Sequence, residues 1–302
     1  MHRLLITGGT GFIGRALCEH LLEKGYRLTV LTRDTGQPGL IDHIAIRYVS
    51  DLDDVAADPP IDAIINLAGE SLNSGRWNER LKQQFLDSRL AATNSVVEWA
   101  GRQPETPRVI VSASAIGWYG HHGDEALTES GEAHDGFSHQ LCERWEQAAC
   151  AAADLGMRVV CLRIGIVLES DGGPLKEMLP PFRLGLGGPM GSGEQYWSWI
   201  HRKDLVRLVE FALDYPGLNG PVNATAPEAV TQREFATALG AALHRPASIP
   251  MPAFAARLAL GKFADEVLLN GQRVVPEKAT FHGFEFEFPT LARALDDILA
   301  KK

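Results

Sequence analysis

The first residues of the chain combine an apolar run with regularly spaced glycines. Residues 4–6 are apolar and come directly before Gly8, Gly11 and Gly14, and a periodic apolar segment follows at 15–24. This order predicts a buried strand, a tight turn and a helix. Glycines let the backbone approach a pyrophosphate, and the free amides of a helix N-terminus attract its charge. We therefore predict a dinucleotide site rather than a purely structural turn. The expected contacts there are Gly8, Thr10, Gly11, Phe12 and Ile13.

The end of the second predicted strand, 27–32, bears on the choice of dinucleotide. Thr32 and Arg33 close this strand. An acidic residue at this place binds the ribose hydroxyls of NAD, whereas a hydroxyl and a guanidinium suit the 2′-phosphate of NADP. Asp34 comes one position too late and should point elsewhere. We predict NADP as the cofactor, with Thr32 and Arg33 as contacts; the alternative is that Arg33 is a solvated surface side chain.

Composition and charge limit the classes of function. The 302 residues are 45% hydrophobic and carry a formal net charge of −9. This acidic balance argues against nucleic acid or an anionic membrane as the main partner. No apolar run approaches the roughly 20 residues of a membrane span. We expect a cytoplasmic protein that acts on a small-molecule substrate. The sequence leaves undecided whether it forms a homodimer. The four cysteines show no metal-binding spacing, so no metal site is predicted.

Apolar runs alternate with helical segments through the first half of the chain. This alternation predicts an α/β fold with a doubly wound parallel sheet that is covered by helices on both faces. The later strands are expected at 44–50, 63–67, 108–112 and 158–163, and the longer helices at 78–100 and 138–153.

The composition changes after Val167. Residues 171–193 are rich in glycine and proline, which predicts a long loop with a short helix. We expect a dinucleotide-binding domain over 1–168, completed by strands near 197–200 and 221–224. Residues 169–302 should form a small, mostly helical lobe over the substrate.

The spacing Gly8-x-x-Gly11-x-x-Gly14, within Thr-Gly-Gly-Thr-Gly-Phe-Ile-Gly, resembles the extended short-chain dehydrogenase/reductase superfamily. The resemblance implies that the cofactor also contacts the end of the fourth strand, the following helix, and the ends of the fifth and sixth strands. The positions that match are Leu67, Ala68, Gly69, Gln84, Arg89, Ser112 and Val167. For Gln84 and Arg89 the alternative is a surface role, and for Val167 it is an ordinary place in the core.

The same match concerns the catalytic groups. Ser114 occupies the position of the catalytic serine, and Tyr119 belongs to a Tyr-Gly pair that follows the strand. The superfamily's base is a tyrosine four residues before a lysine, whose charge lowers the phenol pKa. In this chain Ser138 and Cys142 stand at those two positions, so the usual proton relay is missing. Ser114 and Tyr119 are then the candidate donors; a structural hydroxyl is the alternative for each.

Further motifs resemble one divergent branch of the superfamily, the atypical extended reductases that are labelled epimerase family proteins. They are Leu67-Ala68-Gly69-Glu70, Arg76-Trp77, Ser88-Arg89, Trp145-Glu146, the Gly-rich segment 186–193, Trp199-Ile200-His201, Asn223-Ala224-Thr225-Ala226-Pro227 and Gly283-Phe284-Glu285-Phe286. The resemblance covers essentially the whole chain. It implies NADP binding and says little about the substrate, for which a nucleotide sugar is one candidate.

Two functions fit these observations. The leading hypothesis is an NADP-dependent oxidoreductase or epimerase with a non-standard proton relay. The alternative is a non-catalytic NADP-binding protein that senses redox state or serves as an interaction module. Polar groups that face the nicotinamide would favour the enzyme, and a closed apolar cleft would favour the sensor.

Overall fold

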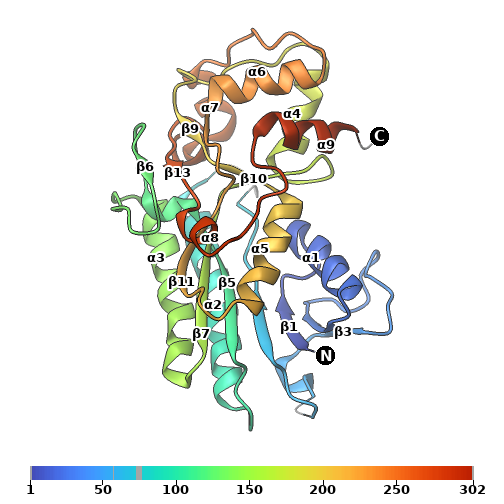
Figure 1. The fold of residues 1–302 in the computed structure, drawn as a ribbon. Coiled ribbons are helices and arrows are strands. Elements are labelled where there is room, and N and C mark those ends of the chain that lie inside the picture. The colour runs from blue at the N-terminus through green and yellow to red at the C-terminus, as the bar shows by residue number, and fades with distance from the viewer. Residues whose placement is uncertain (1, 57, 73–76, 301–302) are drawn as a thin grey trace.

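The computed structural model describes residues 2–56, 58–72 and 77–300. Arg76, part of one family motif, lies outside these ranges. Seven parallel strands form the main sheet in the order β11-β7-β5-β4-β1-β2-β3 (Figure 1). In chain order they are β1 Arg3–Thr7, β2 Arg27–Leu31, β3 Ile46–Val49, β4 Ala63–Asn66, β5 Val109–Ala115, β7 Arg158–Ile164 and β11 Gly220–Ala224.

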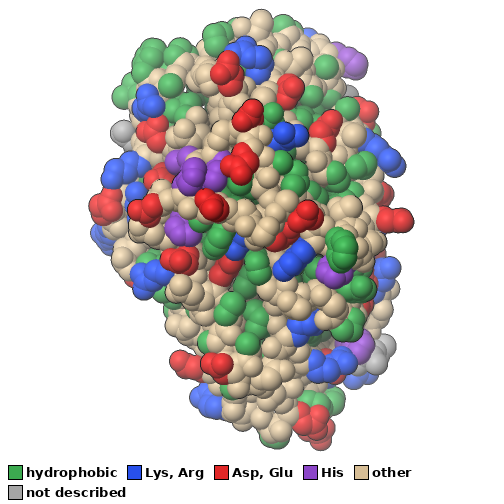
Figure 2. Space-filling view, turned by 60° about the vertical axis from the view of Figure 1, so that its left-hand side comes forward, with side chains coloured by type: hydrophobic (Ala, Val, Ile, Leu, Met, Phe, Trp, Pro, Cys, Tyr) green, Lys and Arg blue, Asp and Glu red, His purple; other side chains and the backbone are tan. Residues whose placement is uncertain are grey.

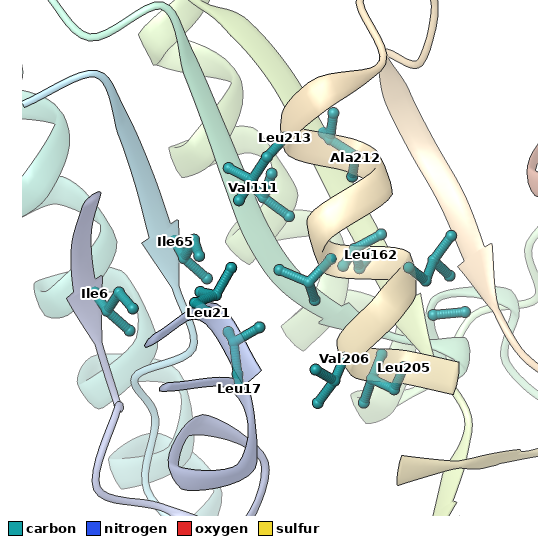
Figure 3. Close-up of a cluster of buried hydrophobic side chains, with 14 of the residues drawn as sticks. Ile6, Leu17, Leu21, Ile65, Val111, Leu162, Leu205, Val206, Ala212 and Leu213 are labelled. Carbon is teal, nitrogen blue, oxygen red and sulfur yellow. The ribbon is translucent and has the colours of Figure 1, made fainter. Parts of the chain in front are cut away.

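Helices cover both faces of this sheet, as the alternating apolar runs predict. Helices α1 (Phe12–Glu23) and α5 (Arg202–Asp214) lie on one face, and α2 (Glu79–Gly101) and α3 (Phe137–Cys150) cover the other. Figure 3 shows α1 and α5 packing their apolar stripes onto inward-facing strand residues such as Ile65. Alternate residues of each strand face opposite sides, so Leu4 and Ile6 join this core while Leu5 joins the other.

The strand predicted near 197–200 does not complete the main sheet. Residues there divide between β9 (Tyr196–Trp197) and β10 (Trp199–His201). The first pairs antiparallel with β12 (Val230–Thr231), and the second pairs with β8 (Ile166–Leu168), a continuation of the chain beyond β7. The strand predicted at 221–224 does return to the sheet, as β11 beside β7.

The C-terminal part is mostly helical and lies over the carboxyl ends of the strands (Figure 1). Its own core joins α4 (Gly173–Arg183), α6 (Gln232–Ala242) and α9 (Leu291–Ala300). The remaining elements are α7 Ala253–Leu260, a π-helix Ala264–Leu268, α8 Glu277–Phe281, and the short paired strands β6 Ala126–Leu127 and β13 Arg273–Val274.

Two features are absent from the residues that the structure describes, a membrane-spanning helix and a cluster of metal ligands. No helix among these residues is both long and apolar enough to cross a bilayer. Within the same ranges, no three His, Cys, Asp or Glu side chains gather as metal ligands would. Acidic and basic side chains are interspersed on the face shown in Figure 2.

Candidate dinucleotide and substrate site

The glycine turn follows β1 directly and opens at the N-terminus of α1. Gly8 has a φ of +69°, and a side chain there would lie 2.7 Å from the backbone of Leu67 at the end of β4. A side chain on Gly14 would overlap the carbonyl oxygen of Gly8. These two glycines therefore let the turn, the helix and the neighbouring strand meet closely.

Gly11 plays a different part, because its surroundings are open. A Cβ at this position would have only the Gly8 oxygen within 4 Å, at 3.3 Å. Gly11 is the N-cap of α1 and supplies no capping side chain, and the first amide bonded within the helix is that of Arg15. The amides of Phe12, Ile13 and Gly14 come before it and point out of the helix end. This geometry fits a bound phosphate.

Thr10 and Phe12 complete the turn. Thr10 is exposed beside Gly11. The Phe12 ring packs against the turn at Gly172 and Gly173, where α4 begins, and the Arg202 guanidinium lies 4.9 Å from its centroid. Phe12 thus joins the glycine turn to the C-terminal part. Its contact with a cofactor stays a prediction.

Arg33 lies just beyond the end of β2 and is exposed, and within the described ranges it has no ion-pair partner. The neighbouring Asp34 points elsewhere, as expected, because its carboxylate accepts a hydrogen bond from the Gly36 amide at 2.9 Å. The Thr32 hydroxyl accepts a hydrogen bond from Gln37 at 3.3 Å. An exposed guanidinium that makes no ion pair with the described residues is available to an anionic ligand.

Helix α2 fixes the segment after β4. The amide of Glu70 donates to the Ser88 hydroxyl at 3.1 Å, and Arg89 donates to the Glu70 carbonyl at 3.1 Å. Gly69 gives this arginine room, because a Cβ there would lie 3.1 Å from the Arg89 side chain. Gly69 and Arg89, two of the predicted cofactor contacts, therefore lie side by side.

Arg89 is 7% exposed and lies 5.0 Å from the centroid of the Trp145 ring. Burial lowers the pKa of its guanidinium, against the opposing effects of Cys142 and Glu70. Its Nε is buried without a hydrogen-bond partner in the described structure. A buried cation with an unused donor next to Gly69, just after β4, is consistent with an anionic ligand.

Ser112 is not at the end of its strand, because β5 continues to Ala115. Its hydroxyl accepts a hydrogen bond from Asn66 at 3.2 Å. Asn66 also donates to Thr93 and accepts from Thr7 at 2.7 Å. This buried network ties the ends of β1 and β4 and the middle of β5 to α2. Sequence reasoning missed Asn66, although a polar residue within the apolar run 63–66 was the available signal.

Tyr119 has the surroundings of a structural side chain. It is completely buried, and its hydroxyl is 2.7 Å from Asn223 Oδ1, 2.9 Å from the Thr128 carbonyl and 3.1 Å from Arg163. Burial raises the pKa of this phenol, opposed by Arg163, whereas a proton acceptor at neutral pH needs a lowered one. These contacts favour the alternative of a structural hydroxyl, and a catalytic role for Tyr119 stays a prediction.

Ser114 lies near the carboxyl end of β5 and is 2% exposed. Its hydroxyl donates to Glu146 at 2.7 Å, and Glu146 also accepts two hydrogen bonds from Arg163. The predicted serine is therefore held by a buried ion pair. Its contact with a substrate stays a prediction.

The structure brings Ser138 and Cys142 together on one face of α3, against the turn that follows β5. A Cβ on Gly117 would lie 3.1 Å from Ser138 and 3.7 Å from the Cys142 sulfur. Burial raises the pKa of the Cys142 thiol to about 12. The thiol is therefore neutral and cannot replace the lysine cation.

The last two predicted cofactor contacts are Gln84 and Val167. Gln84 is exposed on α2 and stays an untested prediction. Val167 is 7% exposed, pairs with Ile200 and belongs to the main core, which favours the alternative of a core side chain. A backbone contact of Val167 with the cofactor remains open to test.

Comparison with known proteins decides the family. The model of the NAD dependent epimerase/dehydratase family matches residues 4–224. The chain belongs to this family. A second model, a domain of unknown function called DUF1731, matches residues 251–298. The resemblance inferred from the glycine turn is confirmed.

Individual relatives extend over nearly the whole chain. An epimerase family protein of Mycobacterium bovis is 40% identical over 96% of this chain and 95% of its own length. The human epimerase family protein SDR39U1 is 38% identical over 99% of this chain and all of its own. A crystal structure of the human protein with NADPH superposes with a TM-score of 0.89, at 35% identity and over 99% and 100% of the two chains. A homologue from Arabidopsis thaliana, 37% identical over 97% of this chain and 86% of its own length, is described as chloroplastic.

Proposed function

We propose that this protein binds NADP(H) and uses it in an oxidoreductase or epimerase reaction on a small molecule. The observation that carries the proposal is the open, uncapped N-terminus of α1 at Gly11, with the exposed Arg33 at the end of the adjacent strand. The human relative that was crystallised with NADPH supports it. The family description names NAD, but the hydroxyl and guanidinium that follow β2 favour the phosphorylated dinucleotide.

In this arrangement each part of the chain has a distinct role. The α1 amides would hold the pyrophosphate, Arg33 the 2′-phosphate, and Arg89 would place positive charge beside the turn. The bound nicotinamide supplies hydride chemistry. Polar groups line α2 and α3 near Ser138, and this favours an enzyme over a redox sensor. A cytoplasmic location remains our prediction.

Replacing Arg33 with alanine should remove most of the preference for NADPH over NADH. A charge-assisted contact with a phosphate contributes about 1.5–3 kcal/mol, which is roughly ten- to a hundredfold in affinity. Fluorescence titration of the wild type and the variant with both dinucleotides measures this. Arg27→Ala, at the opposite end of β2, is the control and should keep the preference. An unchanged ratio in Arg33→Ala would show that Arg33 is only a surface side chain.

A further inference from the structure

Helices α2 and α3 pack against each other, and several of the side chains between them are polar or charged. At the inner end, Trp145 donates to the Thr93 hydroxyl at 3.1 Å. Arg89 follows over the Trp145 ring, and Lys82 lies two turns further out, with its ammonium 4.6 Å from the centroid of Phe137. Residues 82, 89 and 93 share one helical face by their spacing. Lys82, Arg89 and Thr93 thus form a row that leads outward from the buried hydrogen-bond network of Asn66.

Glu266, from the π-helix of the C-terminal part, meets the outer end of this row. Its Oε2 accepts a hydrogen bond from Ser138 at 3.1 Å, and its Oε1 lies 3.9 Å from the Lys82 ammonium. The side chains of Lys82 and Glu266 are 13% and 19% exposed. They are largely shielded from bulk water, which strengthens their electrostatic interaction.

The Glu266 carboxylate lies next to Ser138, a position that is catalytic in the superfamily. Ser138 is the residue that stands where the superfamily has its tyrosine, one turn before Cys142. The Cys142 thiol in turn lies beside Ser114 and Ala115 at the end of β5. Glu266 therefore brings an ionisable group to the place that the missing phenol leaves, and Lys82 supplies the cation that Cys142 cannot.

The apolar surroundings suggest what such a site would accept. The Trp77 ring has Phe137 and Phe263 as edge-on neighbours, with centroids 5.6 and 5.4 Å away. Phe137 and Phe263 are each only partly buried. Phe137 directly precedes Ser138 in the sequence, and Phe263 comes three residues before Glu266. Aromatic surfaces next to one charged pair suit an apolar carbonyl compound or the matching alcohol.

We propose that Glu266, with Lys82 as its cation, is the proton-transferring group for an apolar carbonyl substrate. This inference rests on the proposed function, which supplies NADPH as the reductant. In reduction, the carbonyl carbon gains the hydride as its π bond opens, and the carbonyl oxygen takes the proton from the Glu266 carboxyl. Glu266 is left as a carboxylate beside Lys82 and regains a proton from water. Ser138 orients the carboxyl group.

The test compares Glu266→Gln with Glu79→Gln. Glu79 also joins α2 to the C-terminal part, through a 2.6 Å pair with Lys262, but that pair is largely exposed. NADPH oxidation is followed with phenanthrenequinone, benzaldehyde and diacetyl. Glu266→Gln should lose about 10²–10⁴ in turnover, as expected for a general acid. Glu79→Gln should keep wild-type turnover. The affinity for NADPH and the urea midpoint of the protein without cofactor should not change in either variant.

One further variant separates proton transfer from a structural contact. Glu266→Asp keeps the carboxyl and should recover part of the lost turnover.

Several outcomes would overturn the inference. They are wild-type turnover in Glu266→Gln, a wild type that binds NADPH but oxidises it with none of the three probes, or a loss of turnover that parallels a lower urea midpoint without rescue by Glu266→Asp. Failure of the wild type to bind NADPH would instead refute the proposed function.

Discussion

Replacing Gly11 with valine should abolish NADPH binding while the protein stays folded. The backbone of Gly11 has a φ of −80°, which any residue can adopt, and the nearest atom to a new Cβ is the Gly8 oxygen at 3.3 Å. The added side chain would instead stand at the N-terminus of α1, where we place the pyrophosphate. The expected loss is at least about a hundredfold in affinity, or roughly 2.8 kcal/mol.

The measurement is a fluorescence titration with NADPH, together with circular dichroism to check the fold. Gly123→Val is the matched control, because Gly123 is exposed and a Cβ there meets nothing within 4 Å. Gly8→Val should behave differently from both and unfold more readily, since Gly8 combines a positive φ with a close approach to Leu67. Normal NADPH binding by Gly11→Val would mean that the turn is structural.

The second large effect concerns stability. Glu146 and Arg163 form a two-point ion pair, with distances of 2.9 and 3.0 Å, and their side chains are 11% and 3% exposed. Burial alone would lower the pKa of Arg163, but Glu146 and Tyr119 outweigh it and raise the pKa. Glu146→Gln should therefore destabilise the protein by about 3–5 kcal/mol, because the variant leaves a buried cation without its partner.

Urea unfolding of the wild type and the variant measures this difference. Glu19→Gln is the control, since Glu19 pairs with Arg15 on the surface of α1, with both side chains more than half exposed. It should change the stability by no more than about 0.5 kcal/mol. The double variant Glu146→Leu, Arg163→Met should recover much of the loss. A small effect of Glu146→Gln alone would show that Arg163 is satisfied by its other contacts.

Local patterns predict most of the sheet and the cofactor end of the site. Gly11 and Gly14 have their nearest contacts within the first turn itself, and the apolar runs that precede the turns recur as β1, β2, β4 and β7. The turn after β2 is equally local, and Asp34 bonds within its own loop as expected. These features follow from residues close together in the chain.

Sequence reasoning is least informative where the structure depends on contacts between residues far apart in the chain. Tyr119 matches a family position, but its hydroxyl donates to Asn223, 104 residues away, a contact that the sequence pattern does not predict. The segment near 197–200 has the pattern of a strand, yet its partner is β8 rather than the main sheet. Glu266 lies 128 residues from Ser138, and no local pattern predicts that they meet. Contacts of this kind are visible only in the folded structure.

The most direct test of the central claim is the affinity of the wild-type protein for the two reduced dinucleotides, measured side by side at one salt concentration. The amides at the start of α1 should bind the pyrophosphate of either dinucleotide, and Arg33 adds a contact that only NADPH can use. We predict that NADPH binds at least about tenfold more tightly than NADH. Equal affinities for NADPH and NADH, or no binding of either, would contradict the account.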